Sequence, residues 1–221
     1  MRKVLLAAAA LSACASIAAP ALSSAGPSPL ESRALSRAQV IRTEINARYR
    51  LLQSGALAVT EATSTGVVES FALATSDLLE RRLVPADDGI WYAICPVRIR
   101  CPYPTRPFAR AAGDRVLRRM LLELALRTFV ETSADLVAVS LPTTRFIAFV
   151  VERKDLAREV NFRSLAAVLG GNPARPLTAS VENIVHHVTR PRVFLFAGLE
   201  PTPSGRSAWA GLPLWPSTGS P

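Results

Sequence analysis

Histidine is scarce in this sequence of 221 residues, which contains two, His186 and His187. Neighbouring positions on a helix point about 100° apart, so these side chains are not placed to chelate one metal ion as a pair four residues apart would be. The sequence also lacks H-E-x-x-H, G-x-S-x-G and a Walker loop. These absences argue against a metalloprotease, an α/β-hydrolase and a P-loop protein, and we expect no metal and no cofactor.

A hydrolase-like enzyme that uses His186 or His187 is kept as an alternative. It would need a serine, a threonine or a carboxylate beside the imidazole, and no motif in the sequence selects one. We therefore assign no catalytic residue, and we prefer a protein without enzymatic activity. The carboxylates that we expect at turns, helix caps or solvated positions are Asp87, Asp88, Glu123, Asp135 and Glu152.

Lysine is almost absent, since Lys3 and Lys154 are the only two. The formal charge of +9 therefore comes mainly from arginine, and it falls by two, to about +7, without the N-terminal Arg2 and Lys3. Arginines spread over a whole chain are typical of background composition, whereas a cationic surface attracts anionic partners. Both interpretations stay open at this point.

The first 25 residues have the pattern of a secretory signal peptide. Arg2 and Lys3 form a positive start, residues 4–11 form a short apolar stretch, and small residues follow. Two A-x-A-like cleavage sites end at Ala21 and Ala25. The apolar stretch is far shorter than the ~20 residues that a membrane span needs. The sequence therefore predicts export, with the protein secreted, periplasmic or in the cell envelope.

Cysteine is limited to Cys14, Cys95 and Cys101. Residues 11–14 (LSAC) resemble a bacterial lipobox, so a lipoprotein tethered through Cys14 is an alternative to cleavage after the small residues. Removal or lipidation of Cys14 leaves a pair, and an exported protein is expected to have an even number of cysteines. A metal site lacks further ligands here, and a redox pair usually has the CxxC spacing. We predict a disulfide bond between Cys95 and Cys101.

The densest apolar sequence outside the N-terminus lies in residues 113–151, and it begins with an amphipathic helix. Asp114 is placed to cap a helix over 115–132. The face opposite its apolar stripe carries several arginines, with Glu123 and Arg127 at the favourable i,i+4 spacing of an ion pair. We expect this polar face to lie in solvent.

Apolar periodicity predicts the remaining elements. Two pairs of strands are expected to form hairpins, one with Asp88-Gly89 at its tip and one, of inner strands covered on both faces, that ends the segment 113–151. The run 66–75 also fits a helix, and its Val, Phe and Thr content favours a strand. The other predicted helices cover 31–53, 155–169 and 178–188; the predicted strands cover 56–62, 66–75, 82–84, 90–94, 136–141, 145–151 and 192–197.

The stretch 96–112 is rich in proline and arginine, and its prolines exclude a regular helix or a central strand. Tyr103 and Phe108 lie among the arginines, and the predicted disulfide would hold one end of this loop. Such a loop can bind an anion by bidentate and stacking contacts. The candidate anion-binding residues are Arg98, Arg100, Arg106, Arg110 and Arg118.

We expect one α+β domain over residues 31–200, with an antiparallel sheet and helices packed on one face. A signal peptide at 1–25 and a linker at 26–30 precede it, and a tail rich in Pro, Ser and Gly follows at 201–221. The expected function is that of a secreted or envelope-associated protein that binds an anionic partner. Anionic envelope polymer or lipid headgroups fit that description. Export argues against intracellular nucleic acid, and membrane attachment is expected only through a lipid anchor.

Overall fold

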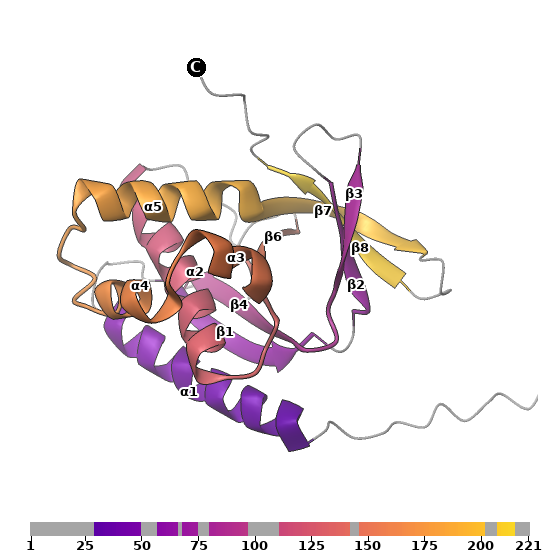
Figure 1. The fold of residues 1–221 in the computed structure, drawn as a ribbon, viewed down its shortest axis with the longest axis horizontal. Coiled ribbons are helices and arrows are strands. Elements are labelled where there is room, and N and C mark those ends of the chain that lie inside the picture. Colours follow the sequence, from indigo (N-terminus) through magenta and orange to yellow (C-terminus); the bar gives the residue numbers. More distant parts are fainter. Residues whose placement is uncertain are drawn as a thin grey trace, which may run out of the picture.

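The structure is a computed structural model that describes residues 29–49, 57–65, 68–74, 80–96, 111–141, 146–201 and 207–214. In these ranges five α-helices pack against one sheet of eight strands (Figure 1). The helices are α1 (Pro29–Tyr49), α2 (Ala111–Glu131), α3 (Arg153–Glu159), α4 (Phe162–Leu169) and α5 (Ala179–Thr189). The strands are β1 (Leu57–Ser64), β2 (Ser70–Ala74), β3 (Arg81–Pro85), β4 (Gly89–Pro96), β5 (Leu136–Ser140), β6 (Ile147–Glu152), β7 (Val193–Pro201) and β8 (Ser207–Pro213).

The sheet is strongly curled because one long two-stranded ribbon, in which β1 and β2 pair with β4 and β3, contributes strands to both of its ends. The strand order is β1-β4-β5-β6-β7-β8-β2-β3, so β1 pairs with β4 at one end and β2 pairs with β3 at the other. Along the chain, however, β1 leads into β2 and β3 leads into β4. Four strands separate β4 from β2 in the sheet, yet the rings of Trp91 on β4 and Phe71 on β2 stack with centroids 5.9 Å apart. The two ends of the sheet therefore face each other.

A tight corner bends this ribbon between its two halves. The backbone N–H of Thr65 donates to the carbonyl of Gly89 at 3.0 Å, and that of Ala86 donates to the carbonyl of Glu69 at 2.9 Å. The Thr65 hydroxyl also hydrogen-bonds to the carbonyl of Ala86. A Cβ atom at Gly89 would lie 2.3 Å from the Oγ1 atom of Thr65. Only glycine fits the corner without displacing its neighbours.

The two faces of the sheet belong to two cores, as the alternation of side chains along a strand requires. On β4, Tyr92 is buried in the core beneath the helices, whereas Trp91 packs on the core of the opposite face. The buried apolar side chains of the five helices all belong to the first core. The second core is rich in aromatic rings, and Trp91 and Phe146 stack there at 5.6 Å with an interplanar angle of 3°.

The predicted α+β class is confirmed, but the sheet is mixed rather than wholly antiparallel. β4 and β5 run parallel because α2 crosses between them and returns the chain to the same end of the sheet. β8 also pairs parallel with β2. The predicted hairpin of inner strands is confirmed, since β5 and β6 pair antiparallel and are almost entirely buried.

Two local expectations were wrong. Strands 82–84 and 90–94 do not form a hairpin, because β3 pairs with β2 and β4 pairs with β1 and β5. The predicted helix 155–169 is two helices, since the chain is extended at Val160 and Asn161, and the Asn161 side chain caps α4 by accepting from the N–H of Ser164 at 3.0 Å.

The sheet also continues past residue 200, into the stretch that was expected to be a tail. β8 lies between β7 and β2 and so is an inner strand. Trp209 on β8 packs against Phe146 with ring centroids 4.7 Å apart. A strand with Gly211 and Pro213 has weak strand propensity, and its place in the sheet comes from its neighbours on both sides.

Candidate functional site

Most of the predicted site residues lie outside the described part of the chain. Cys14, Cys101, Arg98, Arg100, Arg106 and Arg110 belong to this group. Cys95 lies in β4 with its backbone opposite Ala58 of β1. The Cys95–Cys101 disulfide, the lipid attachment and the anion-binding loop therefore stay predictions. Arg118 is the predicted anion-binding residue that the structure describes.

Most of the α2 face that was expected in solvent is buried, although Arg115 at its start is exposed. Arg118 is 8% exposed, Arg119 is 5% exposed and Glu123 is fully buried. The expectation was wrong for these residues because α1, α4 and α5 pack around α2 (Figure 1). Buried charges need partners, so these residues define the polar structure of the helical layer.

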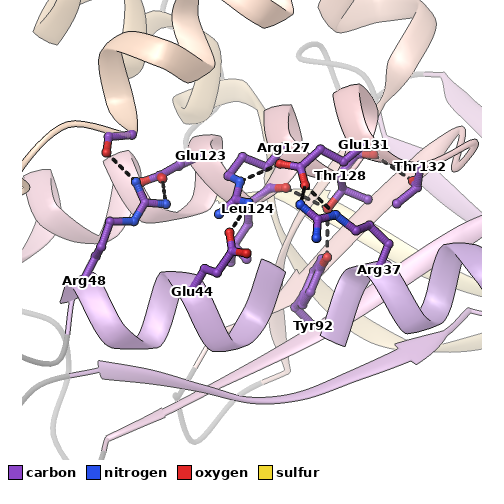
Figure 2. Close-up of polar contacts among 11 residues, drawn as sticks. Arg37, Glu44, Arg48, Tyr92, Glu123, Leu124, Arg127, Thr128, Glu131 and Thr132 are labelled. Carbon is purple, nitrogen blue, oxygen red and sulfur yellow. Dashed lines mark hydrogen bonds and ion pairs between the residues drawn. The ribbon is translucent and has the colours of Figure 1, made fainter. Parts of the chain in front are cut away.

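Glu123 is held by two residues from the end of α1. The Tyr49 hydroxyl donates to the Oε2 atom of Glu123 at 2.8 Å. The Arg48 guanidinium forms an ion pair with Oε1 (Figure 2). Burial raises the pKa of Glu123 above its ordinary value of 4.5, although the Tyr49 hydrogen bond and Arg48 oppose the shift. Burial and the charge of Glu123 also raise the pKa of Tyr49, which keeps the phenol protonated as a donor.

Arg48 and Arg119 cap the C-terminal end of α4. Arg48 donates to the carbonyl of Gly170 at 2.6 Å. Arg119 donates to the carbonyls of Leu169 at 2.9 Å, Gly171 at 3.2 Å and Arg175 at 3.1 Å. The last carbonyls of a helix lack partners within the helix and carry partial negative charge, so guanidinium groups stabilise them. These contacts fix the chain that leads from α4 to α5.

A second ionic cluster joins α1 to the end of α2. Glu131 accepts from Arg127 at 2.7 Å and from Arg37 at 2.7 Å, and Arg127 also pairs with Glu44 (Figure 2). Burial works against ionisation of Glu131, but the hydrogen bonds from Arg127 and Arg37 outweigh it and hold its pKa below 4.5. The predicted Glu123–Arg127 pair was wrong, because each residue finds its partners on α1 or one turn further along α2.

A cavity of about 570 Å³ lies beside this cluster, between α1, α2 and α4. Its charged lining residues are Glu44, Arg48, Arg127 and Glu131. Each of them already forms an ion pair with another residue of the protein. The charges are therefore best explained by their role in joining the helices.

A second cavity, of about 540 Å³, lies between α2 and α5, and we call it the α2–α5 groove. Arg115 and Arg118 line it from α2, and Glu182 and His186 line it from α5. Arg118 reaches the Oγ1 atom of Thr189 at 3.4 Å. His186 and the next residue along α5, His187, are both exposed. The structure thus brings a predicted anion-binding arginine and a predicted candidate histidine to one site.

Sequence patterns did not predict the contribution of α5 to this groove. Glu182 and His186 are four residues apart and therefore share one face of the helix. That spacing was visible in the sequence, within a correctly predicted helix. The partner helix was not visible, because α2 and α5 are far apart along the chain and meet only through packing.

Carboxylates that looked scattered in the sequence also converge. Asp87, Asp88, Asp135 and Glu152 line a depression of about 280 Å³ together with Lys154. Glu152 pairs with Arg82 at 2.6 Å and with Lys154 at 2.8 Å. Within the described ranges, no group of three or more His, Cys, Asp or Glu residues is arranged to hold a metal ion.

Comparisons with known proteins found no matching family model, no similar curated protein and no similar solved structure. None of the described helices combines the length and the hydrophobicity that crossing a membrane requires.

Proposed function

We propose that this protein is exported and binds an anionic partner in the α2–α5 groove. One observation carries the proposal: Arg115 and Arg118 from α2 and His186 from α5 line the same cavity. A guanidinium in a partly desolvated site attracts a carboxylate or a phosphate more strongly than one in bulk water does. The fork of N–H donors also matches the two oxygens of such a group.

The signal-like segment at 1–25 suggests the compartment in which the partner is found. Anionic lipid headgroups and anionic envelope polymer are both present outside the cytoplasm, whereas intracellular nucleic acid is not. Attachment to a membrane would use a lipid on Cys14. Measurement of the intact mass of the native protein tests that alternative, because lipidated Cys14 and a start after Ala21 or Ala25 give different masses.

Binding to vesicles tests the proposal directly. The protein should be retained on vesicles that contain an anionic lipid but not on neutral vesicles, and retention should weaken as salt is raised. Replacing Arg115→Gln should reduce retention, whereas Arg163→Gln on the exposed surface of α4 should not. Retention that does not respond to salt, or that both variants reduce equally, would contradict an anion site in the groove.

The hydrolase-like alternative also has one supporting observation, since Glu182 and His186 line the groove together. A carboxylate beside an imidazole can orient it as a general base. Among the described lining residues there is no serine, threonine or cysteine, so the nucleophile would be water. Turnover of chromogenic esters that is lost in His186→Gln and retained in His187→Gln would favour this alternative over simple binding.

A further inference from the structure

The α2–α5 groove has an apolar part as well as a cationic part. Pro176, Leu177 and Val185 line it together with the side chains of Arg115, Arg118 and His186. Leu177 is partly buried against the core beneath the helices, and Val185 is 4% exposed. A ligand that consists only of a charged group would leave this apolar surface in water. A ligand with an attached apolar group would cover it.

The apolar part of the groove is held in place before any ligand binds. Arg119 donates to the carbonyl of Arg175 at 3.1 Å, directly before Pro176. The same side chain holds Leu169 and Gly171, so the whole segment from α4 to Pro176 is tied to α2. A preformed wall lowers the entropy cost of binding. Arg118 and Arg119 thus have different roles, one lining the groove and the other positioning its wall.

The charges in the groove indicate where an anionic group would lie. Among the described lining residues, Arg115 and Arg118 are on α2, and the one carboxylate, that of Glu182, is on α5. Guanidinium groups attract an anion and a carboxylate repels it. The anionic group of a ligand is therefore expected next to α2.

The volume of about 540 Å³ suits a small organic molecule or one headgroup with the first part of its chain. We infer that the α2–α5 groove binds an amphiphilic anion, in which one carboxylate or phosphodiester group is attached to an apolar chain. This inference rests on the proposed function and adds the chemical class of the ligand. The same chemistry occurs in a free fatty acid and in a lipid headgroup, and the experiment below separates the two.

Titrations followed by NMR of the Leu177 and Val185 methyl groups test the inference. Hexanoate should bind at least about tenfold more tightly than acetate, because its longer chain removes apolar surface from water. Hexanol, which lacks the charge, should show no saturable binding. Inorganic phosphate should bind more weakly than hexanoate. Short-chain phosphatidylglycerol, used below its micelle concentration, represents the lipid headgroup. Whichever of phosphatidylglycerol and hexanoate binds more tightly identifies the source of the ligand.

Variants separate the two parts of the groove. Arg118→Gln and the exposed Arg115→Gln should each weaken hexanoate binding several-fold, and Leu177→Ala should reduce the advantage of hexanoate over acetate. Glu182→Gln should strengthen phosphate binding several-fold by removing the repulsion. Arg163→Gln is the matched control for loss of an arginine.

Three results would overturn the inference. Acetate that binds as tightly as hexanoate would show that the apolar wall is not used, and inorganic phosphate that binds as tightly as hexanoate would show that an attached apolar chain is not required. Both leave the proposed anion site standing. Failure of every anion to bind would overturn the inference and the proposed function together.

Discussion

The hydroxyl of Tyr49, the last residue of α1, donates a 2.8 Å hydrogen bond to the fully buried carboxylate of Glu123 in the middle of α2. The two residues are 74 positions apart in the sequence. Their contact joins the first and second helices at the centre of the helical layer, and Arg48 extends it to the end of α4. The stability of this layer therefore depends on a polar interaction as well as on its apolar core.

Replacement of Tyr49→Phe should lower the free energy of unfolding at neutral pH by about 1.5–3 kcal/mol, the range for a buried hydrogen bond to a charged group. Tyr92→Phe is the matched control, since the Tyr92 hydroxyl lies 2.8 Å from the neutral Thr128 hydroxyl. Burial raises the pKa of Tyr92 to about 12, so this pair stays neutral. Its loss should cost about 1 kcal/mol. Urea denaturation measures both, and an equal or smaller loss for Tyr49→Phe would contradict the assignment.

The contribution of Glu123 to the free energy of unfolding should fall, and not rise, as the pH increases through its pKa. Because burial raises its pKa above 4.5, its contribution to folding is fully present below about pH 4.5 and is lost as the pH rises through the raised pKa. The stability of the protein relative to Glu123→Gln should therefore decline as the pH increases from 4.5 towards neutrality. Urea denaturation of both proteins across this range measures the difference, and a difference that grows with pH would refute the prediction.

Glu131 should show the opposite dependence. Its pKa is held below 4.5, since the hydrogen bonds from Arg127 and Arg37 outweigh the effect of burial. Its contribution to folding is present above about pH 4.5 and is lost as the pH falls through the lowered pKa. The destabilisation caused by Glu131→Gln should thus be largest near neutral pH and shrink in acid. A constant difference across the titration would mean that the ion pairs do not shift the pKa in the folded protein.

The corner of the ribbon should not tolerate a side chain at Gly89. Gly89→Ala would place its Cβ atom 2.3 Å from Thr65 Oγ1 and 3.2 Å from the carbonyl of Ala86, and overpacking of this kind costs about 1–3 kcal/mol. Gly171→Ala is the control, because its Cβ would meet only the carbonyl of Val168 at 3.5 Å. Combining Gly89→Ala with Thr65→Ala should cost less than the sum of the single changes. Strict additivity in thermal unfolding would argue against the clash.

Removal of the Arg119 guanidinium should loosen the connection between α4 and α5. Arg119→Met keeps most of the side-chain volume but leaves the carbonyls of Leu169, Gly171 and Arg175 without this donor. We expect a loss of about 2 kcal/mol and faster hydrogen exchange in α4 and the residues that follow it. Arg163→Met on the exposed surface should stay within about 0.5 kcal/mol. Unchanged exchange in α4 would show that Arg119 does not hold this segment.

Local sequence patterns predicted most of the elements. The apolar spacing of α1 and the low polar content of β5 and β6 identify them without knowledge of their neighbours, because a helix or strand must place its apolar residues on the buried side. Residues such as Ala38, Ile41 and Ile45 recur at helical spacing and are fully buried. The α5 helix was also predicted within a residue or two of its observed ends.

The same patterns gave wrong predictions where a short stretch of sequence fits two structures equally well. Asp88-Gly89 is a tight turn in the structure, as the residues predict, but the strands on its two sides belong to opposite ends of the sheet. A turn motif specifies the backbone at four residues and not the partners of the strands that follow. The polar residues of α2 were expected in solvent because charge usually marks an exposed face, and α2 breaks that rule because three other helices pack against it.

The amino-acid sequence alone therefore specified the apolar periodicity, the α+β class and the positions of the arginines and histidines along the chain. Which of these side chains meet was decided by the tertiary structure. Arg118 and His186 line one groove, and Tyr49, Arg48 and Glu123 form one buried cluster, because helices distant in the chain pack on the same face of a curled sheet. Such contacts depend on the total packing of the core, and no short stretch of sequence encodes them.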